Sequence, residues 1–289
     1  MLYHKIQKHI PAAFFILSVA GWGVFPAAAQ TVVDAATLSA PIEVDGDPGD
    51  WAGVPSYRIG LTGRGGVDSV EMKFAVHGDT IYVLAVWADA TESRLHKPYK
   101  WDELTLSYRR TDQLEDRLAI SFPMSGDFSH NKLSGAEFTA DVWHWKASRS
   151  DPAGIAHDKT WRASRSEFPG AKKFTGPDGQ AIYLARPSDA GDQLYTPVKH
   201  EAKQEDLMPR YDVNLSPQGS IADVRAKGIW RDGRWYLEMA RKLDSGHDDD
   251  AVIPAAGRIL FAVAAFNDVD NERHSVSETF VLQTGGYGN

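Results

Sequence analysis

Hydrophobic and polar residues alternate with a period of two along much of the chain, which predicts β-strands. In residues 69–89, SVEMKFAVHGDTIYVLAVWAD, the even-numbered positions from Val70 to Val76 share one face, and a nearly continuous apolar run follows. Because His77-Gly78-Asp79 separates the two runs, this stretch predicts a hairpin. A second hairpin is expected around Asp232-Gly233, a pair suited to tight turns with positive φ angles.

Further alternating segments predict at least four more strands. They lie at 101–110 (Leu104, Leu106, Tyr108), 117–122, 257–268 and 275–283. No long segment has a helical period, so the chain is expected to be all-β, an antiparallel sandwich or barrel. In RLAISFPMSGDF (117–128), the alternation stops at Phe122, and Pro123 and Met124 follow. The strand is therefore expected to end after Phe122, and the Met124 side chain is expected to point out of the sandwich.

Residues 164–221 differ from their surroundings, because they are rich in Pro, Gly and charged residues and have little periodicity. Strands resume directly afterwards. We therefore expect a long irregular insertion between strands rather than a second domain.

The first 29 residues have the layout of a secretory signal peptide: Lys5 and Lys8, an apolar run of about 15 residues, and the small residues Ala27-Ala28-Ala29. The apolar run is shorter than the ~20 residues that a membrane-spanning helix needs. The mature domain is expected to be 30–289, periplasmic or secreted, without a membrane span. Its formal net charge of −10, against −8 for the whole chain, argues against nucleic acid as a partner.

The chain contains no cysteine. This excludes disulfides, thiolate metal sites, iron–sulfur clusters and covalent haem attachment through C-x-x-C-H. Any cofactor is therefore held without bonds to cysteine sulfur.

Motifs of hydrolytic enzymes are absent, including G-x-S-x-G and H-E-x-x-H. Three acidic stretches, 45–51, 248–250 and 268–275, have features of calcium loops. The first lacks the ligand spacing of a calcium-binding helix–loop–helix, and an Asx turn before a buried Trp51 is the simpler interpretation. A hairpin turn is the preferred interpretation of the third.

Aromatic and soft-ligand residues suggest a haem site. In DVWHWK (141–146), an extended backbone places Trp143 and Trp145 on one face and His144 on the other. These tryptophans suit a cofactor wall, a sugar platform or a core. Met124 and His274 are candidates for a Met/His axial pair, which is common in electron-transfer haem proteins because both iron positions are filled.

The chain resembles the haem-binding domain of the ethylbenzene dehydrogenase γ-subunit type, which is related to DOMON cytochrome domains and, more distantly, to family 9 carbohydrate-binding modules. The matching segments occur in the expected order from about 35 to 283: PIEVDGDPGDWAGVP, IYVLAVWADAT, EDRLAISFPM, DVWHWKASRSDPAGIAHD, GRWYLEMARKL and FAVAAFNDVDNERHSVSETFVL. The resemblance implies an immunoglobulin-like or DOMON-type β-sandwich with one haem, here non-covalent haem b.

The resemblance also implies roles for residues. Met124 matches the family's axial methionine, and His274 occupies the late position of the second ligand, with Lys242 as a weaker alternative. Phe128, Trp143 and Trp145 are candidate pocket residues. His130 and His144 are further alternatives, His130 as a remnant of the C-x-x-C-H motif of some relatives.

The implied function is electron transfer rather than catalysis. The partner would be a molybdopterin oxidoreductase or a membrane cytochrome b. Two other hypotheses stay open from the sequence: a carbohydrate-binding module with solvent-accessible tryptophans, and a cofactor-free structural or sensory lobe of a respiratory complex.

Overall fold

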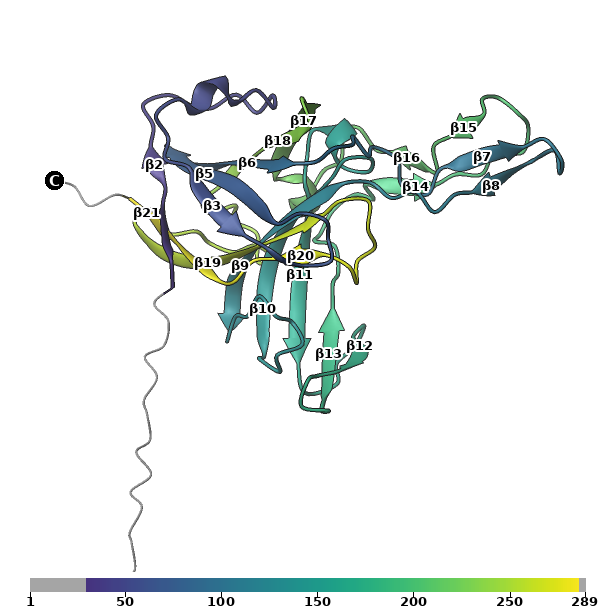
Figure 1. Ribbon diagram of the computed structural model, residues 1–289. Coiled ribbons are helices and arrows are strands. Elements are labelled where there is room, and N and C mark those ends of the chain that lie inside the picture. The colour runs from purple at the N-terminus through teal and green to yellow at the C-terminus, as the bar shows by residue number, and fades with distance from the viewer. Residues whose placement is uncertain (1–29, 286–289) are drawn as a thin grey trace, which may run out of the picture.

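Two β-sheets face each other and enclose the core, as the computed structural model shows for residues 30–285 (Figure 1). The predicted signal peptide lies outside the described residues. Within the described part there is no α-helix, and no helix is long and apolar enough to cross a membrane. The all-β prediction is confirmed.

The large sheet has ten strands, in the order β1-β21-β19-β9-β10-β11-β13-β12, with β20 and β4 joined at its side. Its strands are β1 (Val32–Asp34), β4 (Thr62–Gly63), β9 (Arg117–Gly126), β10 (Phe138–Lys146), β11 (His157–Ser164), β12 (Lys172–Thr175), β13 (Ala181–Ala185), β19 (Gly257–Phe266), β20 (Ser275–Val276) and β21 (Phe280–Thr284). The lower ends of β10, β11 and β13 extend beyond the facing sheet (Figure 1).

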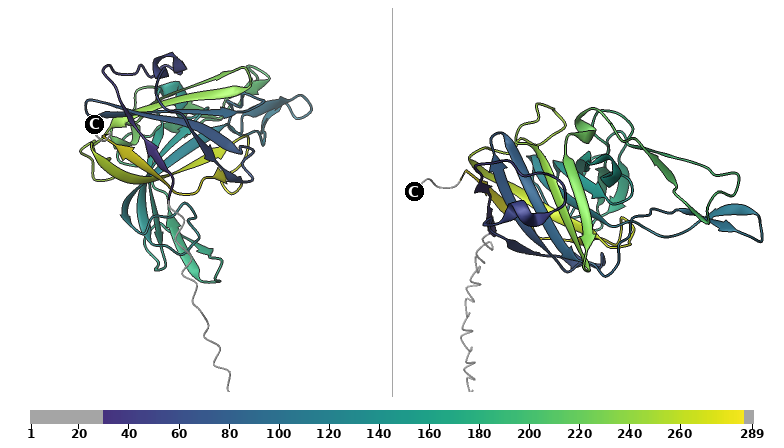
Figure 2. Two further views of the ribbon diagram at one scale, coloured as in Figure 1. Left: turned by 60° about the vertical axis from the view of Figure 1, so that its left-hand side comes forward. Right: turned by 90° about the horizontal axis from the view of Figure 1, so that it is seen from above.

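The small sheet has the order β17-β18-β6-β5-β2, with β3 paired to β5. Its strands are β2 (Ala36–Thr37), β3 (Tyr57–Gly60), β5 (Ser69–His77), β6 (Thr80–Ala88), β17 (Arg225–Arg231) and β18 (Arg234–Lys242). The remaining elements are β7 (Tyr99–Asp102), β8 (Ser107–Arg110), β14 (Tyr195–Pro197), β15 (Leu207–Met208), β16 (Tyr211–Val213) and three 3₁₀ turns, η1 (Pro48–Trp51), η2 (Asp151–Ala153) and η3 (Ser220–Ala222). Strands β7, β8 and β15 form an arm that projects from the sandwich (Figures 1 and 2).

Both predicted hairpins are confirmed. Strands β5 and β6 are joined across Gly78, and β17 and β18 across Asp232-Gly233, whose φ angles are 53° and 74°. Two successive positive φ values match the right-handed twist of the flanking strands. The DG pair therefore fixes this register locally.

The single strand predicted at 101–110 is wrong, because the segment is the end of β7, a turn and β8. Asp102 ends β7, and its Oδ1 accepts hydrogen bonds from the backbone N–H groups of Leu104 (2.9 Å) and Thr105 (3.3 Å). This Asx turn reverses the chain into β8, and Leu104 lies 95% exposed at the tip. The alternation of Leu104, Leu106 and Tyr108 therefore imitates a strand at the tip of a hairpin.

The end of the strand that carries Met124 also differs from the prediction. Strand β9 continues to Gly126, with Ala140 of β10 opposite Pro123 and Thr139 opposite Ser125. Met124 is thus an extra residue without a partner in β10, which is a β-bulge. Its half-buried side chain packs against the core between the sheets.

The irregular segment 164–221 is built into the sandwich in part. Its strands β12 and β13 extend the large sheet beyond β11, β15 pairs with β7, and β14 pairs with β16. The segment therefore contributes structure to both the sheet and the arm.

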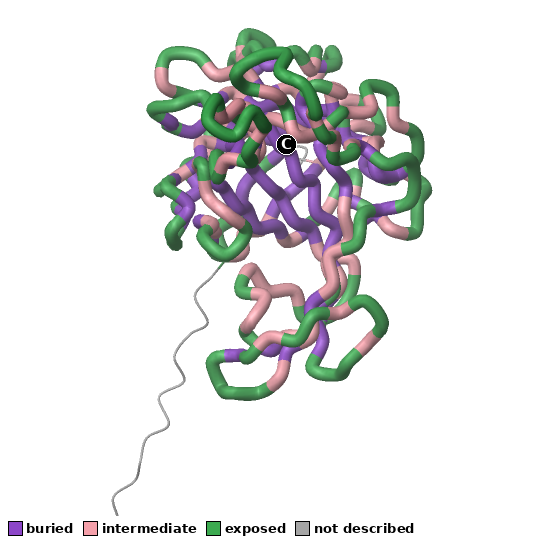
Figure 3. The backbone as a smooth tube through the Cα atoms, turned by 90° about the vertical axis from the view of Figure 1, so that its right-hand side faces the viewer, coloured by how far each residue is buried: buried purple, intermediate pink, exposed green. Residues whose placement is uncertain are grey.

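The core consists of the inward positions of the facing strands, and buried backbone gathers at the centre of the molecule (Figure 3). Trp87, Trp145 and Trp235 pack as a group, with Trp145 and Trp235 edge to face at 5.0 Å between ring centroids. Outside this core, Trp51 is fully buried after the predicted Asx turn, and its indole N–H donates to Glu238 Oε1 at 2.7 Å. The turn interpretation of residues 45–51 is confirmed.

Substituting Gly228 by alanine should lower the free energy of unfolding by about 1–3 kcal/mol, because a Cβ there would lie 2.3 Å from Trp145 Cζ2 in the packed core. Urea denaturation measures the change. Gly60→Ala is the matched control, since a Cβ at this strand glycine meets nothing within 4 Å. Equal stabilities of the two variants would contradict the packing described for Trp145.

Asp116 gives the stability a defined pH dependence. It is completely buried, and its carboxylate accepts hydrogen bonds from the Ser93 and Asp268 backbone N–H groups and from the Trp235 indole. Burial raises its pKa to about 7, with a smaller contribution from the charge of Asp89. The folded state therefore holds a proton that the unfolded state releases at lower pH.

The stabilising contribution of protonated Asp116 should be complete below pH about 4 and should disappear as the pH rises to about 7, with a slope of up to ~1.4 kcal/mol per pH unit. Urea unfolding of the wild type and of Asp116→Asn over this range isolates the effect. Parallel curves for the two proteins would show that Asp116 titrates normally.

Candidate functional site

The outer face of the large sheet carries an apolar surface of small side chains. Residues of β9 and β19 alternate between the core and this face, so Ala119 and Ala264 point away from the core. Together with Val142 and Phe266 they form a buried cluster, against which Trp161 packs. We call this set, with His144 and His274, the outer-face cluster.

Two histidines and an arginine lie against the ring of Phe266, with Arg117 Cζ 4.2 Å from the ring centroid. The centroid of His144 lies 5.6 Å from that of Phe266 and the centroid of His274 lies 5.3 Å away, with interplanar angles of 24° and 30°. His144 is 9% exposed, and its Nε2 is buried without a hydrogen-bond partner among the described residues. Burial lowers the pKa of His144 well below its ordinary value, so the imidazole is neutral.

His274 has the tautomer of a metal ligand. Its Nδ1 lies 2.9 Å from the carbonyl oxygen of Asn271, so Nδ1–H donates and Nε2 keeps its lone pair. Metal-binding histidines commonly donate their other ring N–H to a carbonyl or carboxylate in this way. Burial, followed by the charge of Lys132, lowers the pKa of His274 and favours the neutral ring.

Basic side chains gather around the same face. Lys132 Nζ lies 3.4 Å from the ring centroid of Trp161, and Arg186 lies over the same ring. Burial and the charge of Arg186 lower the pKa of Lys132 to about 7, and burial lowers that of Lys159 to about 8. Lys146 is buried and contacts His157, and burial lowers its pKa well below the ordinary value. The surroundings of these lysines therefore disfavour their charged form.

Trp143 and Trp145 lie in the core. Both are fully buried between the sheets, and the Trp145 indole donates to Asp151 Oδ1 at 2.9 Å. The predicted alternation with His144 is confirmed, but neither tryptophan borders an open site. His144 is the residue of this stretch that faces outward.

Met124 and His274 are not brought together. His274 stacks on Phe266, which pairs with Arg117 at the start of β9. Met124 lies seven residues further along the same strand, roughly 23 Å at ~3.3 Å per residue. In this arrangement one iron does not reach both side chains.

The other predicted residues lie in three places. Phe128 packs on Phe138 in a separate cluster near the lower ends of the strands. His130 contacts Thr279 (3.4 Å) and Glu278 (3.5 Å) beside β21. Lys242 is on the small sheet, where it is exposed and pairs with Asp79 at 3.9 Å.

A second polar group, missed in the sequence, closes the edge between the sheets. Arg241 of β18 contacts Asp141 of β10 (2.7 Å), Asp250 (3.2 Å) and Asp158 of β11 (3.4 Å), and these four side chains are at most 1% exposed. We call them the carboxylate–arginine cluster. Charged residues inside apolar strands are the signal that could have found it.

The chain was compared with protein-family models, with curated proteins and with solved structures. A family model described as ethylbenzene dehydrogenase matches residues 40–277. No curated protein matches the sequence. Among solved structures, a family 9 carbohydrate-binding module from Caldicellulosiruptor kristjanssonii in complex with glucose is 12% identical, with 90% of this chain and 98% of that chain covered and a TM-score of 0.40.

A putative carbohydrate-binding protein from Bacteroides uniformis is 9% identical, with 89% of this chain and 100% of that chain covered and a TM-score of 0.42. The similarity of both structures is too distant to bear on function.

Proposed function

The chain belongs to the ethylbenzene dehydrogenase family, and from this premise we propose that it is a periplasmic, non-catalytic electron-transfer domain that binds one haem b on the outer-face cluster. Its redox partner would be a molybdopterin oxidoreductase or a membrane cytochrome b. The observation that carries the proposal is a neutral histidine with a free Nε2 beside a small-residue apolar surface.

The outer-face cluster fits the chemistry of haem. The alanine and valine side chains of the cluster are small and apolar, and the aromatic rings of Phe266 and Trp161 lie beside them. The cations of Lys159 and Arg186 lie beside this cluster and would pair with the two carboxylates of the haem. Bound haem would supply one-electron exchange, and the protein would supply ligands and an apolar surrounding.

His274 is the proposed ligand on this face. Lys132 would be the second residue to hold the haem iron, because its charge reaches His274 and its lowered pKa makes the neutral amine accessible near pH 7. Met124, predicted from the sequence, is the alternative and would require the bulged end of β9 to move toward the iron.

Titration of the purified mature chain with haem tests the proposal. We expect one haem per chain and a low-spin spectrum that carbon monoxide leaves unchanged, because two protein ligands occupy the iron. A protein that takes up no haem would contradict the proposal. Retention on a polysaccharide column without pigment would instead support the carbohydrate-binding alternative, although no tryptophan between residues 30 and 285 is exposed.

A further inference from the structure

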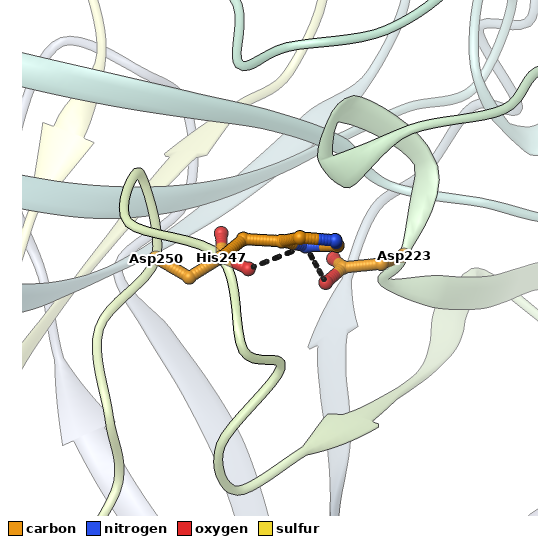
Figure 4. Close-up of side chains that lie close together, drawn as sticks. All are labelled: Asp223, His247 and Asp250. Atoms are coloured by element: carbon orange, nitrogen blue, oxygen red, sulfur yellow. Dashed lines mark ion pairs between the residues drawn. The ribbon is translucent and has the colours of Figure 1, made fainter.

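Asp223, His247 and Asp250 meet beside the carboxylate–arginine cluster. Asp223 follows η3, whereas His247 and Asp250 belong to the loop after β18, and Figure 4 shows the imidazole between the two carboxylates. His247 Nδ1 lies 3.5 Å from Asp223 Oδ2 and 3.5 Å from Asp250 Oδ2. We propose that these three side chains bind a divalent transition-metal ion of the Zn²⁺ class.

The distances suit a bound ion better than direct hydrogen bonds. A hydrogen bond from imidazole N–H to a carboxylate is usually 2.7–2.9 Å long, so at 3.5 Å both contacts are loose. Zn²⁺ binds nitrogen and carboxylate oxygen at about 2.0–2.1 Å in tetrahedral geometry, which places neighbouring donor atoms about 3.3–3.5 Å apart. The three donor atoms lie within 4.8 Å of one another.

Unpartnered oxygens point to the same ion. Both carboxylate oxygens of Asp223 are buried and accept no hydrogen bond from the described residues, and the same holds for Oδ1 of Asp250, whose side chain is 1% exposed. Asp250 Oδ1 has only the ion pair with Arg241 at 3.2 Å. Buried polar atoms without partners are rare in native proteins and call for an explanation such as an ion.

The local charge is also unbalanced. Arg241 is the one buried cation that contacts Asp141, Asp158 and Asp250 within the described residues, and Asp223 adds a fourth carboxylate. A divalent ion would interact favourably with these carboxyl groups. The guanidinium already occupies the space among Asp141, Asp158 and Asp250, so the space beside His247 is the one left for an ion.

The surroundings provide an outer shell and access. Ser245 Oγ donates to Asp250 Oδ2, which leaves that oxygen a lone pair for the ion and holds the carboxylate in place. A cavity of about 390 Å³, lined by Asp223, Arg241, Ser245 and His247 among others, adjoins the group. A water molecule could therefore fill the fourth position. The imidazole favours Zn²⁺ over Ca²⁺ and Mg²⁺, which prefer oxygen ligands alone.

Isothermal titration of the untagged, chelator-treated mature chain with Zn²⁺ tests the site. We expect one equivalent to bind and the melting temperature to rise by about 5 °C at roughly 100 times Kd. His247→Ala and Asp223→Asn should each weaken binding by at least about tenfold. His200→Ala, on the separate segment between β14 and β15, should bind as the wild type does.

Two results would overturn the proposal. One is a wild-type chain that takes up no Zn²⁺. The other is a folded His247→Ala variant that binds Zn²⁺ as tightly as the wild type does. This second result would overturn the proposal also if Ca²⁺ bound equally well to the wild type and the variant. Circular dichroism of each variant confirms its fold, so the comparison stays decisive.

Discussion

Replacing Arg241 by methionine should lower the free energy of unfolding by about 3–5 kcal/mol, because it leaves buried carboxylates without their cation. Arg241 is 1% exposed and contacts Asp141, Asp158 and Asp250, and its Nη2 also donates to the Ala251 carbonyl at 2.6 Å. These aspartates raise the pKa of the guanidinium, so it is charged at every accessible pH.

Urea denaturation in the presence of chelator measures this effect. Arg234→Met, on the exposed end of the same strand, is the control and should change the stability by no more than about 0.5 kcal/mol. Adding Asp250→Asn to Arg241→Met should recover part of the loss, since one buried charge fewer lacks a partner. If Arg241→Met lowered the free energy of unfolding by less than about 1 kcal/mol, instead of the expected ~3–5 kcal/mol, water would have to reach the cluster.

Replacing His274 by alanine should abolish the low-spin haem spectrum and weaken haem binding by at least about tenfold. The reason is that His274 has a free Nε2, a fixed Nδ1–H and a lowered pKa, which together make it the best-prepared ligand of the outer-face cluster. Absorbance spectra at equal haem and protein concentrations measure the loss. His200→Ala should retain the wild-type spectrum.

The second ligand is tested in the same series. Lys132→Ala should convert the low-spin spectrum to a high-spin one that responds to carbon monoxide, whereas Met124→Ala should leave it unchanged. The reverse pattern would identify Met124 as the second residue that holds the iron and would require β9 to rearrange on binding. If both variants kept the low-spin spectrum, the second ligand of the iron would be another side chain.

The parts of the fold that the sequence predicts are those governed by local contacts. The turn at Asp232-Gly233 and the alternation from Val70 to Val76 determine strands by themselves. The prediction failed at Leu104 because an Asx turn at Asp102 overrides the alternation. It failed at Met124 because β10, the next strand along the chain, continues to pair with β9 beyond the bulge.

The candidate site residues follow the same division. His274 and His144 could be named as candidates from their residue type and neighbours, and the outward direction of His144 follows from the strand period. Lys132 could not be assigned, because its position over Trp161 depends on how a loop crosses the sheet. Asp223 and His247 meet only after two loops fold together, so no spacing in the sequence predicts their contact.

The absorbance spectrum of the wild-type protein with one equivalent of haem, recorded oxidised and reduced beside that of His274→Ala, tests the central claim most directly. The account predicts low-spin Soret and α bands in the wild type and their loss in the variant. A wild-type protein that binds no haem, or a variant with the wild-type spectrum, would contradict it.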